Sequence, residues 1–264
     1  MIQQAELLAH IVDISIRAGK EILEIYETDF AVEHKEDKSP LTAADMAAHH
    51  AIVDGLAALT PDVPVLSEES ASIPFATRQS WSRYWLVDPL DGTREFVKRN
   101  GEFTVNIALI EGNSSVMGVV HAPVLDVTYA ASADAGVWKQ QGNAEREAIH
   151  VRKFPADKPT VAGSRSHRGD SLNDFLAKLG EHELLAMGSS LKMCLVAEGS
   201  ADVYPRFGPT SEWDTAAAQA IVEAAGGQLV TLDMQPMRYN TKESLLNPEF
   251  MAIGDMQHDW SALL

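Results

Sequence analysis

An apolar run that leads straight into two aspartates is the most informative feature of the chain. Residues 84–87 are Tyr-Trp-Leu-Val, and residues 88–93 are Asp-Pro-Leu-Asp-Gly-Thr. A carboxylate at the end of a buried strand is costly unless it is paired or bound to a cation. Because the proline restricts the backbone and the glycine allows a sharp bend, we expect a turn that brings Asp88 and Asp91 to one point, with the Leu90 carbonyl between them.

Two further acidic segments lie where elements are expected to begin or end. Residues 67–70, Ser-Glu-Glu-Ser, follow an apolar run, and residues 212–217, Glu-Trp-Asp-Thr-Ala-Ala, open an alanine-rich helix. Each segment alone has an ordinary explanation, because aspartates are common in turns and a carboxylate in the first turn of a helix is favourable by itself. Three acidic segments together are the minimum for a site that binds several metal ions, and hard oxygen ligands suit Mg²⁺.

The elements that must position these segments are helices and short strands. Helical spacing of apolar residues predicts helices at 5–27 and 42–59, and β-branched or aromatic runs predict strands, with a hairpin turn at 111–113. We expect a layered α/β fold with two halves, residues 1–150 with most of the metal ligands and residues 151–264 with the remaining functional residues. The expected strands are 63–66, 84–87, 103–110, 116–121, 127–130, 160–162, 202–204 and 228–231, and the later helices are 171–179, 190–198 and 213–225.

The 264 residues carry a formal net charge of −17 and a single cysteine, Cys194. The acidic balance argues against nonspecific nucleic-acid binding, which needs a basic face. The negative charge either serves solubility in general or comes in part from a carboxylate cluster that binds cations, which would make the local charge positive. One cysteine excludes an internal disulfide, and its apolar helix places it in the core. With neither a signal peptide nor a membrane-length apolar run, we expect a cytoplasmic protein, with peripheral attachment to the inner face of the membrane as an alternative.

The three acidic segments, in this order, resemble the signature of the inositol monophosphatase superfamily of metal-dependent phosphatases. The resemblance covers essentially the whole chain and implies the sugar-phosphatase-like fold, in which helix and sheet layers alternate. It implies an enzyme that uses two Mg²⁺ ions, with a third, looser ion on Glu68 as an option. The metal ligands that it implies are Glu68, Asp88, the Leu90 carbonyl, Asp91 and Asp214.

The resemblance also implies catalytic roles for three side chains. Thr93, which follows Asp-Gly, and Asp45, which ends the segment Thr-Ala-Ala-Asp, would orient the attacking water and take its proton. Glu68 would help to hold the ion that carries this water. Without the resemblance, Asp45 is more simply a carboxylate in the first turn of a helix.

Within the superfamily, the chain is most similar to the CysQ-type 3'(2'),5'-bisphosphate nucleotidases. Ala218 mildly favours this branch, because it stands where the inositol phosphatase branch more often has glycine. The resemblance implies hydrolysis of the 3'-phosphate of adenosine 3',5'-bisphosphate to AMP and phosphate, inhibition by Li⁺, and a role in sulfate assimilation. The segments that carry it are residues 94–96, 101–110, 164–168, 188–192 and 201–214.

A bisphosphorylated nucleotide has a second phosphate, which needs cationic or donor groups outside the metal site. We expect such groups in the C-terminal half, in the part that faces away from the metals, although each could instead be an ordinary surface residue. Two other functions stay open: hydrolysis of inositol phosphate or another sugar phosphate, and a non-catalytic metal or nucleotide sensor. The expected substrate-binding residues are Glu68, Leu90, Asp91, Gly92, Thr93, His167, Gly188, Ser189, Lys192, Arg206 and Asp214.

Overall fold

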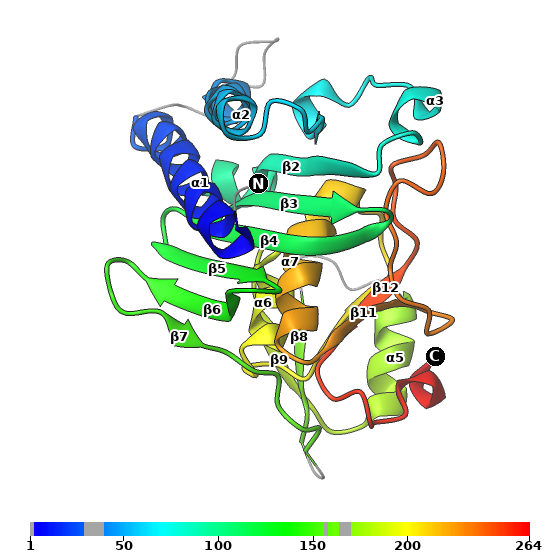
Figure 1. Ribbon diagram of the computed structural model, residues 1–264. Coiled ribbons are helices and arrows are strands. Elements are labelled where there is room, and N and C mark those ends of the chain that lie inside the picture. The colour runs from blue at the N-terminus through cyan, green and yellow to red at the C-terminus, as the bar shows by residue number, and fades with distance from the viewer. Residues whose placement is uncertain (1–2, 29–39, 156–157, 164–169) are drawn as a thin grey trace.

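Helix and sheet layers alternate through the molecule. The structure is a computed structural model, and it describes residues 3–28, 40–155, 158–163 and 170–264. Figure 1 shows α1 (Gln4–Tyr26) and α2 (Pro40–Leu59) outside the first sheet, α6 (Leu191–Ala197) and α7 (Glu212–Ala224) between the two sheets, and α5 (Asp170–Leu179) beyond the second sheet. The expected α/β fold with alternating layers is confirmed.

The first sheet carries two of the aspartates that the sequence singles out. Within the described residues it has seven strands, in the order β1 to β7 along the chain. β1 runs parallel to β2, and every later neighbour is antiparallel. The strands are β1 (Val65–Ser67), β2 (Arg83–Asp91), β3 (Thr104–Glu111), β4 (Ser114–Ala122), β5 (Val127–Ser132), β6 (Gly136–Gln141) and β7 (Glu147–Ala148).

The second sheet is mixed. Its five strands among the described residues follow the order β11-β12-β10-β8-β9, with β8 parallel to both of its neighbours and β12 antiparallel to both of its own. The strands are β8 (Thr160–Gly163), β9 (Glu183–Ala186), β10 (Val203–Arg206), β11 (Gln228–Thr231) and β12 (Phe250–Ile253). The short helices that complete the described chain are η1 (Glu68–Ser70), α3 (Phe75–Arg78), α4 (Thr93–Val97) and η2 (Trp260–Leu263).

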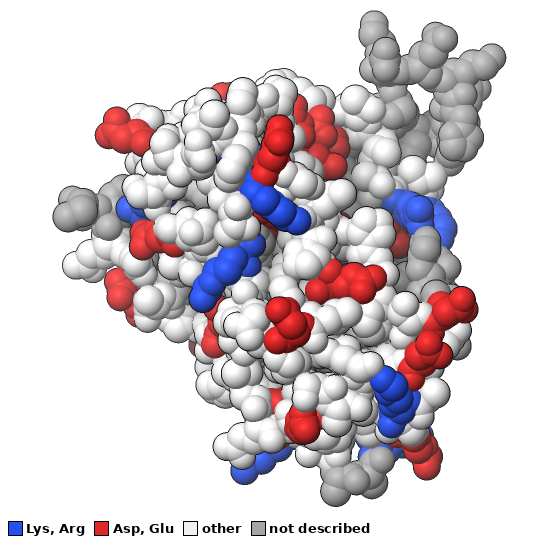
Figure 2. Space-filling model, turned by 90° about the vertical axis from the view of Figure 1, so that its right-hand side faces the viewer, with Lys and Arg blue, Asp and Glu red and all other residues white. Residues whose placement is uncertain are grey.

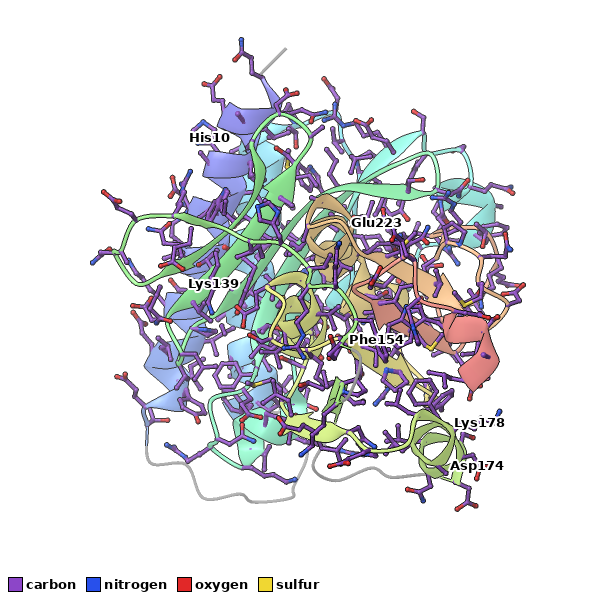
Figure 3. All side chains as sticks on the ribbon, turned by 90° about the horizontal axis from the view of Figure 1, so that it is seen from below. His10, Lys139, Phe154, Asp174, Lys178 and Glu223 are labelled. Carbon is purple, nitrogen blue, oxygen red and sulfur yellow. The ribbon has the colours of Figure 1, made fainter. Side chains whose placement is uncertain are left out.

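Three apolar cores lie between the layers. In the outer one, Ile11, Ala18 and Ile22 of α1 pack with the outward face of the first sheet, and all three are fully buried. The central core joins both sheets through α6 and α7, and the third lies between the second sheet, α5 and η2. Seen from below, α5 lies on the opposite side of the molecule from α1, and its Asp174 and Lys178 project outward (Figure 3). Each layer therefore depends on its neighbours for the burial of its apolar face.

Helix α7 packs directly on the middle of the first sheet. Gly118 of β4 lies under this helix, and a Cβ atom at this position would lie 2.8 Å from the carbonyl carbon of Ala217, with its oxygen closer still. Nearby, Ser115 Oγ donates a hydrogen bond of 2.7 Å to the carbonyl of Ala216. The absence of a side chain at Gly118 thus allows the close approach that places the start of α7 beside β2.

Most of the expected elements are confirmed, including both long N-terminal helices and the hairpin between β3 and β4. Strands β6, β7, β9 and β12 were missed, because they are short or lack the apolar alternation that marks a strand. One prediction was wrong in a way that matters for the site. The strand expected at 84–87 continues to Asp91, so the two aspartates lie within β2 and not in a turn after it.

The described residues contain no membrane-spanning helix, and the face shown in Figure 2 has no basic patch. No helix among the described residues combines the length and apolar character needed to cross a membrane. On the face shown in Figure 2, acidic side chains are spread among uncharged ones, and the described Lys and Arg residues form no continuous patch.

We predict that Gly118→Val destabilises the protein by about 2 kcal/mol or more, because the added side chain forces α7 away from β4. Urea unfolding measures the change. Gly163→Ala is the control, since a Cβ there meets no atom of the described residues within 4 Å. Equal stability of the two variants would contradict the close packing of α7 on the sheet.

Candidate active site

A β-bulge brings Asp88 and Asp91 to the same face of the first sheet. Asp88 pairs with Asn106 of β3 and Asp91 pairs with Thr104, so β2 has one residue more than β3 between these pairs. In a regular strand, residues three apart point to opposite faces, and the extra residue reverses this relation. Asp88 Oδ1 also accepts a hydrogen bond of 3.1 Å from the Leu90 N–H, which holds the carboxylate against the bulge.

Asp214 joins this pair from the first turn of α7. One carboxylate oxygen from each of Asp88, Asp91 and Asp214 can be chosen so that the three atoms lie within 4.8 Å of one another. Asp214 Oδ2 accepts a hydrogen bond of 2.9 Å from the Ser211 N–H, which ties the carboxylate to the start of the helix. Segments more than 120 residues apart in the chain thus place three hard oxygen ligands at one point.

The electrostatics of these three aspartates call for a cation. Burial raises the pKa of Asp88 well above its usual range, and the negative charges of Asp91, Glu68 and Asp214 raise it further. Burial and the charge of Asp214 raise the pKa of Asp91 to about 7, and burial is the main cause that raises the pKa of Asp214 to about 6. A divalent cation would relieve both causes, and carboxylate oxygens are the ligands that Mg²⁺ prefers. The residues present therefore fit the predicted metal.

Glu68 and Asp45 lie at the edge of the carboxylate cluster. Glu68 is the first residue of η1 and is more exposed than the aspartates, yet partial burial and the charges of Asp91 and Glu69 raise its pKa. Asp45 of α2 is buried, and its pKa rises to about 8 through burial, then through the charge and hydrogen bond of Glu69 and the charge of Glu68. Glu69, the second glutamate of the Ser-Glu-Glu-Ser segment, was not predicted to be a partner of Asp45.

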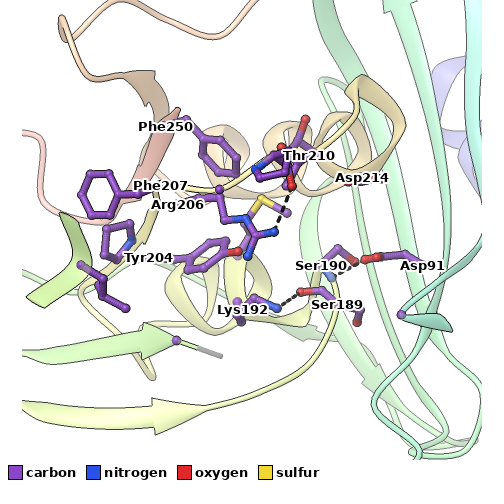
Figure 4. Close-up of a pocket in the computed structure, with 18 of the residues that line it drawn as sticks. Asp91, Ser189, Ser190, Lys192, Tyr204, Arg206, Phe207, Thr210, Asp214 and Phe250 are labelled. Carbon is purple, nitrogen blue, oxygen red and sulfur yellow. Dashed lines mark hydrogen bonds between the residues drawn. The ribbon is translucent and has the colours of Figure 1, made fainter. Parts of the chain in front are cut away.

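A cavity of about 780 Å³ opens beside the cluster and is lined by residues from both sheets (Figure 4). Asp91 and Asp214 lie on one side of it, and Lys192 and Arg206 line the same space. These two cations were expected in a part of the protein that faces away from the metals, and this prediction was wrong. Helix α6 and strand β10 meet the end of β2 at the cavity, which brings both charges to one place.

Lys192 is almost fully buried in the cavity wall. Its Nζ donates a hydrogen bond of 2.6 Å to the Ser189 carbonyl, and it lies 5.4 Å from the centroid of the Tyr204 ring. Burial lowers the pKa of Lys192 to about 8, the charge of Asp91 opposes this, and the charge of Arg206 adds to it. The two cations therefore repel one another, and an anion bound in the cavity would relieve this repulsion.

Two buried polar atoms beside these cations have no hydrogen-bond partner among the described residues. They are Ser189 Oγ and Arg206 Nε, whereas Arg206 Nη2 donates to the Pro209 carbonyl at 3.0 Å. A buried donor without a partner is costly, so a ligand that accepts hydrogen bonds would stabilise this wall.

The structure gathers many of the residues predicted to bind substrate. Glu68 and Leu90 lie beside the aspartates but do not line the cavity. Gly188 is buried against Glu95 and Glu102, where a Cβ atom would not fit, and His167 lies outside the described residues. Those that line the cavity are Asp91, Gly92, Thr93, Ser189, Lys192, Arg206 and Asp214.

The cavity also has lining residues that the sequence analysis did not assign to a site. Tyr204, Phe207 and Phe250 give it an aromatic wall, and Ser190 lies between the wall and Asp91. Tyr204 and Phe207 stand in the segment 201–214, but nothing in their spacing distinguishes a cavity residue from a core residue.

Comparison with known proteins agrees with this geometry. The model of the inositol monophosphatase family matches residues 3–259. The chain belongs to the inositol monophosphatase family. The 3'(2'),5'-bisphosphate nucleotidase CysQ of Salmonella typhimurium is 52% identical over 246 residues, which cover 92% of this chain and 98% of that protein. CysQ of Haemophilus influenzae is 38% identical over 260 residues, which cover 97% of this chain and 96% of that protein.

Solved structures show the same relationship. The crystal structure of CysQ from Bacteroides thetaiotaomicron, described as a bacterial member of the inositol monophosphatase family, has a TM-score of 0.85 and 43% sequence identity, with 94% of this chain and 96% of that chain covered. An inositol monophosphatase from Zymomonas mobilis has a TM-score of 0.80 at 23% identity, covers 100% of this chain and 98% of that chain, and supports the fold alone.

We predict that the metal-free protein loses stability as the pH rises from about 4 to about 8. The folded state keeps protons on Asp45, Asp91 and Asp214 that the unfolded chain releases near its ordinary carboxyl pKa, so a rising pH favours unfolding across this window. Added Mg²⁺ should raise the melting temperature more at about pH 8 than at about pH 5. Melting curves with a chelator and with Mg²⁺ measure both effects, and a Mg²⁺ effect that is larger at the lower pH would contradict the assignment.

We predict that Asp91→Asn removes most of the stabilisation by Mg²⁺ but leaves the metal-free protein at least as stable as the parent near pH 8. The substitution takes away a metal ligand together with one of the mutually repelling charges. Any Mg²⁺-dependent turnover should fall by about 10²–10³-fold. Asp134→Asn, at an exposed turn, is the matched control and should change neither quantity.

Proposed function

We propose that the chain is a Mg²⁺-dependent 3'(2'),5'-bisphosphate nucleotidase that hydrolyses the 3'-phosphate of adenosine 3',5'-bisphosphate to AMP and phosphate. The observation that carries the proposal is the pair of opposite charge clusters in one cavity. The carboxylates of Asp91 and Asp214 lie beside the buried ammonium group of Lys192 and the half-buried guanidinium group of Arg206. The CysQ relatives support it, because this chain matches them over nearly their whole length.

Two clusters of opposite sign suit a substrate with two phosphates. A phosphate at the carboxylate cluster, where Asp88, Asp91 and Asp214 would hold the cations, would be the one that is cleaved, whereas a phosphate at Lys192 and Arg206 would be bound by charge-assisted hydrogen bonds. The cavity of about 780 Å³ is far larger than one phosphate needs and has room for a nucleoside as well. Its aromatic wall offers Phe207 and Tyr204 to the apolar part of such a ligand.

The metal site follows from the carboxylate cluster. We assign the metal ligands to Glu68, Asp88, the Leu90 carbonyl, Asp91 and Asp214, and the number of ions to two, with a third on Glu68 as an option. Mg²⁺ at these residues would supply an activated water and offset charge on the phosphate oxygens.

Asp45 and Thr93 are assigned to the attacking water. Asp45 is buried beside Glu68 and Glu69, and its Oδ1 has no hydrogen-bond partner among the described residues, so it is free to accept a proton or a hydrogen bond. Its raised pKa of about 8 describes the metal-free site, and a cation on Glu68 would favour the ionised base. Thr93 begins α4 and lines the cavity directly after Gly92, whose φ of 101° turns the chain out of β2.

Other features implied by the resemblance remain predictions. They are inhibition by Li⁺, a place in sulfate assimilation and a cytoplasmic location, and all three are consistent with the proposed activity. Peripheral attachment to a membrane has no support in the structure.

The experiment that tests the proposal is phosphate release from a panel of substrates, with and without Mg²⁺. The panel contains adenosine 3',5'-bisphosphate, AMP, inositol 1-phosphate and a simple sugar phosphate. We expect Mg²⁺-dependent release from the bisphosphate, with a kcat/KM well above that of every monophosphate. A preference for inositol 1-phosphate would make the chain a sugar-phosphate phosphatase, and binding without turnover would make it a sensor.

We predict that Lys192→Met and Arg206→Ala each lower kcat/KM for adenosine 3',5'-bisphosphate by about 10- to 100-fold, mainly through KM. A charge-assisted hydrogen bond contributes roughly 1.5–3 kcal/mol, which corresponds to this range. The kcat/KM for inositol 1-phosphate should change far less, because this substrate has no second phosphate that could contact Lys192 or Arg206. Lys178→Met, an exposed lysine on α5, is the control. An equal loss on both substrates would remove the residue-level support for a nucleotide.

A further inference from the structure

A chain of buried hydroxyl and amide groups lies behind the metal-binding aspartates. Ser190 Oγ donates a hydrogen bond of 2.9 Å to Asn106 Oδ1, and Thr104 Oγ1 lies 2.9 Å from the same Ser190 oxygen. Because a serine hydroxyl has a single proton, Thr104 must be the donor to Ser190. All three residues are at most 1% exposed. We call Thr104, Ser190 and Asn106 the hydroxyl–amide chain.

This chain is in register with the candidate metal ligands. On β3, Thr104 stands directly opposite Asp91 of β2, and Asn106 stands directly opposite Asp88. Residues opposite one another on antiparallel strands share a face of the sheet. Besides this strand pairing, a direct hydrogen bond connects the hydroxyl–amide chain to Asp91. The N–H of Ser190, its middle residue, donates a hydrogen bond of 2.6 Å to Asp91 Oδ2.

The same contacts connect the metal site to the cavity wall. Ser190 immediately precedes α6, and its neighbours Ser189 and Lys192 line the cavity. Ser190 therefore holds the side of the cavity that precedes α6 against β3 of the first sheet. A shift of its hydroxyl would move the N–H donor of Asp91 together with the cationic wall.

We propose that Thr104, Ser190 and Asn106 are positioning residues, which set Asp91 for the metal and hold the Ser189–Lys192 segment at a fixed distance from it. The role at Asp91 concerns metal binding alone and does not depend on the substrate. The role at the Ser189–Lys192 segment concerns substrate binding and rests on the proposed function. Groups that hydrogen-bond a metal ligand typically change metal affinity by about 10- to 100-fold when they are removed. Here the Ser190 N–H is the group that bonds Asp91, and Thr104 and Asn106 act on it through the Ser190 hydroxyl.

The hydroxyl–amide chain has one unused donor. With Asn106 Oδ1 bound to Ser190, the amide nitrogen of Asn106 is left without a partner among the described residues and is shielded from water. That donor shares a sheet face with Asp88. Hydrogen bonds in such a chain strengthen one another, so removal of the first hydroxyl weakens the rest.

The test compares Thr104→Val with Thr104→Ser. Valine keeps the shape of threonine and removes the hydroxyl, whereas serine keeps the hydroxyl and removes a methyl group. The readout is the Mg²⁺ concentration that gives half of the thermal stabilisation, measured without substrate. We expect Thr104→Val to raise this concentration about tenfold or more and Thr104→Ser to leave it within about twofold of the parent.

A packing role would give the reverse order, because Thr104→Ser leaves a cavity and Thr104→Val does not. That order overturns the proposal, as does a Thr104→Val variant that melts at a lower temperature with an unchanged Mg²⁺ midpoint. Ser190→Ala supplies an independent variant, which keeps the backbone donor to Asp91 and removes the hydroxyl. It should shift the Mg²⁺ midpoint in the same direction as Thr104→Val, and an unchanged midpoint also counts against the proposal.

The outcome separates this proposal from the proposed function. The Mg²⁺ midpoint needs no substrate, so it can shift even in a chain that does not hydrolyse the bisphosphate. For a chain that does, we expect Ser190→Ala to raise KM for adenosine 3',5'-bisphosphate by about fivefold or more and to raise KM for inositol 1-phosphate less. A shifted Mg²⁺ midpoint with equal KM changes would keep the role at Asp91 and overturn the role at the cavity wall.

Discussion

Carboxylates held together away from water are the constraint on which the rest of the structure depends. Asp88, Asp91 and Asp214 repel one another, and burial removes the solvent that would otherwise screen them. In a folded chain such a group is tolerated when it keeps protons or when it binds a cation. The raised pKa values show that the metal-free site keeps protons. The three carboxylates are also ligands of the kind that a divalent cation needs. The fold is thus stable in a form that is ready to exchange protons for metal.

The layered architecture is what brings these carboxylates together. Two of them share one strand, but the third comes from α7, which reaches β2 only because it lies flat on the first sheet. Gly118 permits that approach, and the second sheet covers the other side of the helix. The metal site therefore depends on packing well outside it, and a change in the contact between α7 and β4 acts on Asp214 without touching it.

The sequence specifies the elements well and their fine geometry less well. The helices at 5–27 and 42–59 could be predicted because their apolar residues recur at helical spacing over many turns. The bulge in β2 could not, because a one-residue mismatch depends on the partner strand, and Asp-Pro-Leu-Asp-Gly is equally compatible with a turn. The sequence correctly predicts that Asp88 and Asp91 lie together, but it attributes this to a turn, whereas the structure has a β-bulge. Strands as short as β7 leave too little pattern to detect.

Contacts between distant segments account for most of what the sequence analysis missed at the site. Ser190 is an ordinary serine before a short helix, and its role depends on Thr104 and Asn106, some 85 residues earlier. The same holds for Lys192 and Arg206, which were expected in a part of the protein remote from the metals. Long-range pairing of this kind leaves no periodic signal, and here a family resemblance was needed to single out residues that spacing could not.

The two charge clusters of the cavity are linked through Lys192. In the metal-free protein the charge of Asp91 partly offsets the cost of burying this ammonium group, and Arg206 adds to that cost. A cation bound at Asp91 would take away part of this compensation, because it neutralises the carboxylate that Lys192 now faces. An anion bound at Lys192 and Arg206 would then stabilise these cations more than it does in the metal-free protein. Mg²⁺ and a ligand that carries a second phosphate should consequently favour each other's binding, while a monophosphate held only at the metals would gain little from the wall. Selectivity for a bisphosphate would in this way arise from the balance of charge across one cavity, as well as from its shape.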